Sequence, residues 1–398
     1  MTPLTISRLG HLGDGLTADG VAVPFTLPGD VVDAAPPHRR HRDSPHRRHP
    51  PCPHFGACGG CALQQADDPF LEGWKEAVIA RALAARGLQA PFLPAFTAPE
   101  RSRRRATLTA RRTRKTVEIG FHARRSDRLV PIKSCGVLHP NLMAALPGLE
   151  ALVRIGGSRK GLLRLALWHS DDGLDVAVSG GKALDLPLRQ ALATLAGAQA
   201  FARLSWEGEV IALHRPPRAE MGRTRVVPPP GAFLQAVAAA ETVMASDAAE
   251  HLAGADPVAD LFAGCGPFAL RLAERSAVHA VEGEDAMLAA LDVAWRGVPG
   301  LRTVTTEVRD LFRRPLLPAD LSRFAGVVLD PPRAGAAAQA AALAQSAVPR
   351  IVAVSCAPVS FARDAAILVA GGYRLTAIRL IDQFRWSPHV ELVARFRR

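Results

Sequence analysis

Residues 256–273 read DPVADLFAGCGPFALRLA, a short apolar run followed by a Gly-rich turn and then by apolar residues at helical spacing. Gly264 and Gly266 allow the chain to turn sharply and to approach a ligand closely. The stretch therefore predicts the first strand, turn and helix of a Rossmann-like sheet. A single GxG is weak evidence by itself, because dinucleotide-binding proteins and ordinary tight turns use the same residues.

Acidic residues follow each of the next three predicted strands. Glu282 ends AVHAVE, Asp310 follows TVTTEVR, and Asp330 ends FAGVVLD. Ligands of such sheets bind beyond the carboxyl ends of the strands, so these carboxylates should meet in one crevice. A dinucleotide site would need a third glycine and no row of acids, whereas acids favour the sulfonium and ammonium groups of S-adenosylmethionine. The row indicates methyl transfer, with Glu282 on the ribose hydroxyls and Asp310 on the adenine amino group.

A cysteine, Cys356, stands where the strand IVAVS gives way to a helix. A helix N-terminus favours anions, so we expect the thiol pKa to lie below its usual value of about 8.5. A small buried apolar residue is the alternative role. A thiolate can add to carbon 6 of a pyrimidine and so make carbon 5 able to accept a methyl group. Glu391, in HVELVARF, is the candidate base for the carbon 5 proton, unless it is a strand residue facing solvent. This chemistry is the same for uracil and cytosine.

Four of the six cysteines have the spacing of metal ligands. The run CPHFGACGGC contains Cys52, Cys58 and Cys61, and Cys135 follows in IKSCG. Four thiolates of this kind bind either zinc or an iron–sulfur cluster, and the spacing slightly favours zinc as the commoner metal. Metal ligands fit a cytoplasmic protein better than disulfides do. The sequence also shows neither a signal peptide nor a membrane span, so we expect a cytoplasmic location.

The net charge of +12 suggests a polyanionic partner, although a GC-rich genome would also favour arginine. The distribution is better evidence than the total. Residues 101–133 contain twelve Lys or Arg and only two acids, within two runs that alternate like strands. We interpret this stretch as a basic β-hairpin that contacts nucleic acid; a solvated charged face is the alternative.

The chain divides into three predicted units of an α/β protein. Residues 1–50 combine short strands with a His/Arg/Pro-rich linker over residues 36–51 that has no apolar residue to bury. Residues 51–228 hold the cysteines, a helix over residues 69–86, the basic hairpin, and mixed strands with a helix around residues 186–195. Residues 229–398 alternate strands and helices, which predicts a parallel sheet and the methyl-transfer domain.

The segments LFAGCG, DPPRAG, SCAPVSFARD and the terminal HVE resemble the RNA uracil-5-methyltransferase family, in particular its iron–sulfur-containing 23S ribosomal RNA branch. The resemblance covers nearly the whole chain and implies uracil as the target, Cys356 as nucleophile and Glu391 as general base. It further implies that four cysteines bind a [4Fe-4S] cluster: Cys52, Cys58, Cys61 and Cys135. It places S-adenosylmethionine on Gln235, Phe262, Glu282, Asp310 and Asp330. Residues 1–33 resemble the first half of a TRAM domain, an RNA-binding β-barrel, here without a second half.

Three residues depart from the family pattern: Ala357 and Pro267 replace asparagines, and Arg385 replaces a proline. None of them removes a thiol or a carboxylate that the chemistry requires. Two alternatives remain open beside methylation of ribosomal RNA. The first alternative is that the target is transfer RNA, although the enzymes that act on it generally lack the cysteines. The second is that the chain is a non-catalytic RNA-binding protein. No feature of the sequence requires a protein partner.

Overall fold

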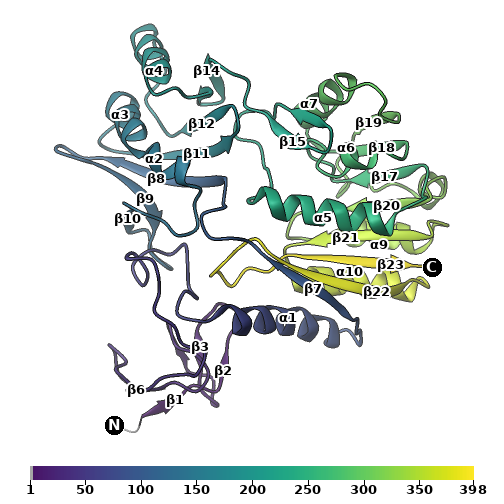
Figure 1. Cartoon of the computed structure of the whole chain (residues 1–398), viewed down its shortest axis with the longest axis horizontal. Helices are drawn as coiled ribbons and strands as arrows, with labels where there is room; N and C mark the ends of the chain where they lie inside the picture. Colours follow the sequence, from purple (N-terminus) through teal and green to yellow (C-terminus); the bar gives the residue numbers. More distant parts are fainter. Residues whose placement is uncertain (1–2) are drawn as a thin grey trace.

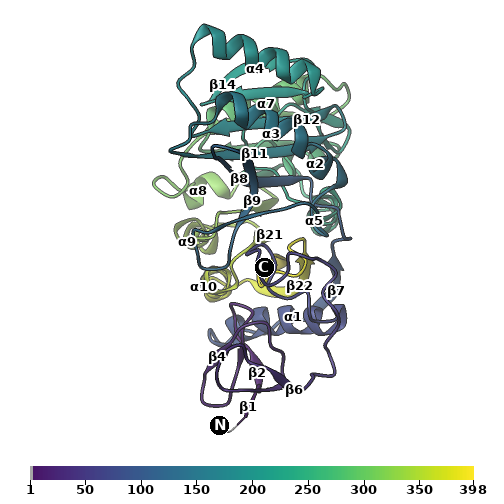
Figure 2. The same ribbon diagram turned by 90° about the vertical axis from the view of Figure 1, so that its left-hand side faces the viewer.

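The computed structural model describes residues 3–398, which form two large sheets and a group of short N-terminal strands (Figure 1). In two views at right angles, the N-terminal strands lie next to helix α1 (Asp68–Ala84), on the side away from the seven-stranded sheet (Figures 1 and 2). Within the described residues, no helix is both long and apolar enough to cross a membrane.

The N-terminal strands form two sheets of three short strands each. The first sheet contains β1 (Leu4–Thr5), β5 (Val31–Val32) and β6 (Arg40–Arg42), and the second contains β2 (Arg8–Leu9), β3 (Gly15–Leu16) and β4 (Ala22–Val23). The sequence predicts a linker without structure over residues 36–51, but part of this segment forms β6. The reason is the buried carboxylate of Asp30, which accepts from the Ser44 backbone N–H at 2.7 Å and pairs with Arg47.

The seven-stranded sheet contains the predicted basic hairpin. In spatial order its strands are β10 (Leu129–Pro131), β9 (Val117–His122), β8 (Arg105–Arg112), β11 (Leu162–Ser170), β12 (Gly173–Ser179), β13 (Arg203–Trp206) and β14 (Glu209–Leu213). β8 and β9 pair antiparallel, with Thr109 opposite Gly120, so the hairpin is confirmed. The predicted second helix is also present, as α4 (Leu186–Ala198).

Helices cover only one face of this sheet. Ala106, Leu108 and Ala110 alternate along β8 into an apolar core that is shared with helices α2 (Pro140–Ala144), α3 (Leu146–Gly156) and α4. The residues between them, Arg105 and Thr107, point to the opposite face. The hairpin of β15 (Ala219–Met221) and β16 (Thr224–Val226) follows this sheet in the chain.

The eight-stranded sheet has the strand order of a Rossmann-like domain with three added strands. Its strands, in spatial order, are β19 (Val304–Val308), β18 (Val278–Glu282), β17 (Val258–Leu261), β20 (Gly326–Leu329), β21 (Arg350–Ser355), β23 (Leu392–Arg397), β22 (Arg374–Asp382) and β7 (Phe92–Thr97). The first five are parallel, and β23 runs antiparallel to both neighbours. The predicted parallel sheet is therefore confirmed.

Helices cover both faces of this sheet, and each face has its own apolar core. Helices α5 (Ala238–His251), α6 (Ala269–Leu272) and α7 (Asp285–Arg296) share one core. Helices α1, α8 (Pro318–Leu321), α9 (Ala337–Ala344) and α10 (Pro358–Ala370) share the other. Val258 and Ala259, neighbours on β17, enter different cores, as expected for a strand that is buried on both sides.

The segment of residues 68–97 differs from the sequence-based division of the chain. The sequence predicts one central unit over residues 51–228, but β7 is an edge strand of the eight-stranded sheet, parallel to β22. Ile79 and Leu83 of α1 are buried in the core below α10. This packing joins strands that are about 280 residues apart in the chain, which local sequence patterns do not report. The limits at residues 50 and 228 stay predictions.

A buried ion pair fixes α1 to this sheet. The Lys75 ammonium is fully buried and donates to the Asp382 carboxylate at 2.6 Å and to the Phe384 carbonyl at 3.3 Å. We expect Lys75→Met to lower the free energy of unfolding by about 3–5 kcal/mol, because it leaves a buried charge without a partner. Urea denaturation measures this loss. The exposed Lys115→Met is the control, and an equal effect of both substitutions would contradict the assignment.

Candidate active site

The Gly-rich turn between β17 and α6 is held by Glu282 at the end of β18. The Gly264 backbone N–H donates to one Glu282 carboxylate oxygen at 2.9 Å, and the Gly283 N–H donates to the other at 2.6 Å. Gly266 has a φ of +97°, and a Cβ there would lie 2.9 Å from the Leu291 side chain, so this position requires glycine. The predicted strand, turn and helix unit is confirmed.

Asp260 is a buried acid beside this turn that the sequence analysis did not single out. One of its carboxylate oxygens accepts from the Ala269 backbone N–H at 2.8 Å. Its other oxygen is buried and has no hydrogen-bond partner among residues 3–398. Burial raises the pKa of Asp260 to about 7. The available signal was an acid inside the otherwise apolar run VADLF, since a buried strand seldom carries a charge without a reason.

Phe262 and Phe312 form an aromatic pair at the same edge of the sheet. Their ring centroids lie 5.4 Å apart with the planes inclined at 55°, and Phe312 is half exposed. Phe262 has a φ of +63°, which is rare for a residue with a side chain. Asp310, after β19, accepts from the Phe312 backbone N–H at 2.9 Å. Asp310 thus holds the turn that presents Phe312, a residue the sequence did not reveal.

Asp330, Gln235, Gln383 and Glu391 form one buried chain of hydrogen bonds. Gln235 donates its amide to the Asp330 carboxylate at 3.4 Å. Gln383 donates to the Gln235 carbonyl oxygen at 2.7 Å and to the Glu391 carboxylate. Burial raises the pKa of Asp330 well above its usual value, and the charge of Glu391 raises it further. These hydrogen bonds connect Glu391, the predicted base, to Gln235 and Asp330, two predicted cofactor contacts.

Cys356 lies directly after β21 and two residues before the start of α10 at Pro358. Its thiol is half buried, and burial raises its pKa, as do the charges of Glu391 and Asp330; Arg333 opposes them. The sequence-based expectation of a lowered thiol pKa is therefore wrong. The loss of hydration and the charges of two nearby carboxylates raise the thiol pKa by more than the N-terminus of α10 lowers it.

Glu391 is buried, with 4% of its surface exposed, which excludes the alternative of a strand residue facing solvent. Burial raises the pKa of its carboxyl to about 7, and the hydrogen bond from Gln383 opposes this shift. Ser355 of β21 pairs with Leu392 of the antiparallel β23, so Cys356 and Glu391 are the next residues at the same end of these neighbouring strands. A carboxyl with a pKa near neutrality can both take up and release a proton under cellular conditions.

Turnover should increase as the pH rises through about 7. A base must be ionised to accept a proton, and the Glu391 carboxyl ionises above its pKa, which burial has raised. The Cys356 thiol, with its own raised pKa, adds to the increase in the same direction. Single-turnover rates measured between pH 5.5 and 9 test this expectation. A rate that is flat across this range, with the protein folded throughout, would contradict it.

The three departures from the family pattern lie close to this site and are structurally accommodated. Ala357 precedes α10, and its backbone N–H donates to the Ser355 hydroxyl at 3.2 Å. The Pro267 carbonyl accepts from Arg271 at 2.8 Å. Arg385 donates to the Asp68 carboxylate at 2.6 Å and lies over the Trp386 ring at 5.0 Å. Arg385 thus binds the final loop to α1.

The four candidate ligand cysteines surround one cavity of about 440 Å³. Burial raises the pKa of the Cys61 thiol to about 12 and raises those of Cys58 and Cys135, and the mutual charges of the group add to these shifts. Within residues 3–398, no three His, Cys, Asp or Glu side chains converge as ligands of a single metal ion. The thiols enclose a space, and Phe384 and His389 of the final loop also line it.

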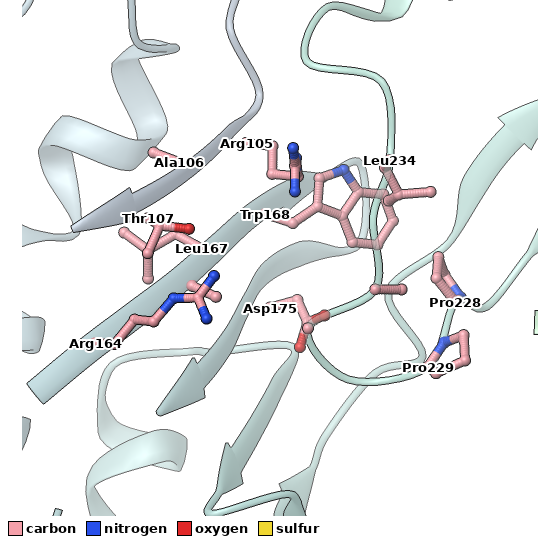
Figure 3. A pocket seen from close by; sticks show the side chains of 13 residues that line it. Arg105, Ala106, Thr107, Arg164, Leu167, Trp168, Asp175, Pro228, Pro229 and Leu234 are labelled. Carbon is pink, nitrogen blue, oxygen red and sulfur yellow. The ribbon is translucent and has the colours of Figure 1, made fainter. Parts of the chain in front are cut away.

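A second, smaller hollow of about 40 Å³ lies on the uncovered face of the seven-stranded sheet, where Pro228 and Pro229 approach it (Figure 3). Figure 3 shows Arg105 beside the Trp168 indole, with Arg164 on the neighbouring strand. Burial and the charges of Arg103 and Arg164 lower the pKa of Arg105 to about 10. The Arg105 guanidinium lies 4.3 Å from the ring centre of Phe233, which is 62% exposed. Two cations, Arg105 and Arg164, therefore line this hollow, and one of them also contacts the exposed Phe233 ring.

The sheet order, the Gly-rich turn and the buried acids define a methyltransferase domain of the Rossmann-like type. A sequence model described as tRNA (Uracil-5-)-methyltransferase matches residues 228–396. An uncharacterized RNA methyltransferase of Brucella suis biovar 1 is 46% identical over 400 residues, which cover 98% of this chain and 96% of the relative. A 23S rRNA (uracil(1939)-C(5))-methyltransferase of Chromohalobacter salexigens is 34% identical over 423 residues, covering 98% and 87%. The chain belongs to the RNA uracil-5-methyltransferase family.

A solved structure shows the same fold along the whole chain. The Pyrococcus abyssi tRNA (uracil-54, C5)-methyltransferase, in complex with S-adenosyl-L-homocysteine, covers 99% of both chains with a TM-score of 0.78. The two sequences are 23% identical. The likeness confirms the predicted α/β class and the Rossmann-like C-terminal domain.

Proposed function

We propose that this chain methylates carbon 5 of uracil in 23S ribosomal RNA, with Cys356 as nucleophile and Glu391 as general base. The observation that carries the proposal is the pair itself. A half-buried thiol and a buried carboxyl of raised pKa lie together at the edge of the sheet that carries the Gly-rich turn. Addition and elimination at a pyrimidine ring require these two groups.

The donor site fits S-adenosylmethionine, which supplies an electrophilic methyl group when bound. Glu282 is oriented by backbone N–H groups at the carboxyl end of β18, where the ribose of a nucleoside would lie. Phe262 and Phe312 offer an aromatic surface for the adenine ring. The buried Asp260 carboxyl supports this site, because it holds the first turn of α6 through the Ala269 backbone N–H at 2.8 Å. Gln235, Asp310 and Asp330 complete the proposed contacts.

The reaction follows from the chemistry of the two side chains. The Cys356 thiolate, favoured by the charge of Arg333, forms a bond from its sulfur to carbon 6 of uracil. The electron pair displaced to carbon 5 would form the bond to the methyl group, while the bond from that methyl group to the sulfonium sulfur of the donor breaks and leaves a neutral thioether. Glu391 then removes the proton from carbon 5, the double bond re-forms, and the bond between sulfur and carbon 6 breaks. The thiolate leaves unchanged, and Glu391 passes its proton to solvent.

The RNA would reach this site across the uncovered face of the seven-stranded sheet. Arg105 and Arg164 supply positive charge there, and Phe233 supplies an exposed ring on which a base can stack. Ribosomal RNA is favoured by the relative from C. salexigens, whose name specifies 23S rRNA, and by the cysteines. An enzyme with this substrate works where ribosomes are assembled, so we also propose a cytoplasmic location and activity without an obligate protein partner.

Incubation of the purified protein with labelled donor tests the substrate. Protein-free 23S rRNA and bulk tRNA, both from cells that lack this chain, are supplied in parallel, and 5-methyluridine is quantified in each. We expect label in 23S rRNA only. Label in tRNA only would favour the second target. A 5-fluorouridine RNA tests the enzyme itself, since failure to form a covalent adduct while both ligands bind would leave a non-catalytic RNA-binding protein.

We further propose that Cys52, Cys58, Cys61 and Cys135 bind a [4Fe-4S] cluster. The support for this proposal is that all four thiols line one cavity of about 440 Å³, and that the family resemblance implies a cluster at these cysteines rather than zinc. Such a cluster would join the N-terminal loop to the basic hairpin, because methyl transfer needs no electron. Anaerobic purification should give a brown protein with about four irons per chain. One zinc per chain and no visible absorbance would contradict the cluster.

A further inference from the structure

Gln383 occupies the junction between the predicted base and the predicted donor site. It lies just after β22, in the loop that returns to β23. Its amide nitrogen donates to Gln235 at 2.7 Å and to Glu391, and its amide oxygen accepts from the Val237 backbone N–H at 3.3 Å. The side chain is 98% buried. Both the nitrogen and the oxygen of the Gln383 amide therefore form hydrogen bonds within the protein.

The partners permit only one orientation of this amide. The Val237 backbone N–H can only donate, so it must face the Gln383 oxygen. The nitrogen then faces the carboxylate of Glu391 and the carbonyl oxygen of Gln235, which can only accept. Turning the amide over would place oxygen against oxygen at both contacts. The direction of donation therefore runs from Val237 through Gln383 to Gln235 and on to Asp330.

We propose that Gln383 is a positioning residue, which holds one carboxylate oxygen of Glu391 and leaves the other free to face carbon 5 of the bound base. The same amide holds Gln235, so one side chain fixes the position of Glu391 relative to the donor site. The second oxygen of Glu391 makes no hydrogen bond to any described residue, and is thus available to a substrate. This role rests on the proposed function.

The surroundings keep Gln383 in place from the other side. The neighbouring Asp382 carboxylate is paired with Lys75 of α1, which also donates to the Phe384 carbonyl. Trp386 is fully buried, and its carbonyl accepts from the backbone N–H groups of Ala62 and Leu63 at 3.0 Å. The loop is therefore anchored on both sides of Gln383, and a rigid support is what a positioning residue needs.

Other titratable and charged groups lie near Glu391. The charge of Glu391 raises the pKa of Asp330, after β20, and of Cys356, after β21. Arg333 acts on Cys356 and lies 3.2 Å from His389, and the pair of Lys75 and Asp382 lies behind the loop. A substitution at Gln383 changes none of these groups. Any change in the pH profile of the variant therefore reports the lost amide.

Gln383→Met removes the amide and keeps the length of the side chain. We expect the rate of turnover at saturating substrates to fall by about 10- to 100-fold, as for the loss of one hydrogen bond to a charged group. The acidic limb of the pH profile should move to higher pH, because the amide favours the ionised form of Glu391. Methylated RNA should remain bound to protein on a denaturing gel, since proton removal precedes release. The KM for RNA should change little.

Gln339→Met is the matched control. Gln339 is equally buried, and its amide bonds to the backbone of Leu316 at 2.9 and 3.3 Å rather than to Glu391, Gln235 or Asp330. It should lose stability as Gln383→Met does, with the pH profile unchanged and no adduct. Gln383→Asn keeps an amide in a shorter side chain and should show the same effects in weaker form. It serves as the second variant if Gln383→Met does not fold.

The outcomes separate this proposal from the proposed function. If the wild-type chain forms no 5-methyluridine in any RNA, the proposed function fails. If the wild-type chain is active and a folded Gln383 variant matches Gln339→Met in pH profile and adduct level, only the positioning role is overturned. A shifted acidic limb with trapped methylated RNA, seen at Gln383 alone, supports it.

Discussion

Cys356→Ala should reduce methylation of RNA by at least about four orders of magnitude. Carbon 5 of uracil is a poor nucleophile, and without addition of sulfur at carbon 6 it has no electron pair to offer the methyl group. Five other cysteines remain in the variant, including the buried Cys265 near the Gly-rich turn, but none of them follows β21 beside Glu391. The measurement is 5-methyluridine formed per protein in a single turnover.

Measurements of donor and RNA binding distinguish the loss of the nucleophile in Cys356→Ala from misfolding. Cys356 is a half-buried side chain at the start of a helix, so its truncation should leave the sheet intact. The variant should bind the methyl donor and RNA with dissociation constants close to those of the wild type, and it should form no adduct with 5-fluorouridine RNA. Residual activity above a few per cent of the wild type would show that another group is the nucleophile.

Glu391→Gln should stop the reaction one step later. The thiolate can still add and the methyl group can still be transferred, but an amide does not remove the carbon 5 proton, so the bond from sulfur to carbon 6 persists. We expect turnover to fall by about three orders of magnitude, with close to one equivalent of methylated RNA covalently attached to the protein. Labelled donor and a denaturing gel detect this species directly.

Glu250→Gln is the control for the loss of a glutamate. Glu250 lies on α5, its side chain is 69% exposed, and it pairs with Arg395, which stands opposite Val352, four residues before Cys356. It should retain wild-type turnover. If Glu391→Gln instead turns over normally, or incorporates no methyl group at all, Glu391 is not the base that follows methyl transfer. The first outcome would favour another acceptor, and the second would place Glu391 before methyl transfer.

Local patterns were sufficient where a feature depends on neighbours in the chain. The Gly-rich turn after β17 could be predicted because positive φ angles restrict it to glycine, and the basic hairpin because alternation reports one buried face. The helix predicted over residues 69–86 is α1, which begins one residue earlier and ends two residues earlier. The roles of Cys356 and Glu391 remain predictions, although the structure brings the two side chains together.

Features that depend on long-range contacts could not be predicted in this way. The placement of β7 beside β22 depends on contacts across some 280 residues. Part of the segment of residues 36–51 is ordered by Asp30, a single buried acid. The predicted shift of the Cys356 pKa was in the wrong direction. The helix N-terminus can be recognised in the sequence, whereas burial and the charge of Glu391 cannot.

The stretch of residues 256–273 and the acids after the next strands determined the class of fold, because turn geometry and strand periodicity are local properties of the chain. The cysteine spacing likewise determined that four thiols could act together. Only the tertiary structure decided which groups share an environment. It left one oxygen of Asp260 without a hydrogen-bond partner in the described part of the chain, enclosed a cavity between the cysteines, and put Gln383 between Glu391 and Gln235. Burial and hydrogen-bond partners arise from segments distant in sequence, and they set the charge and orientation on which chemistry depends.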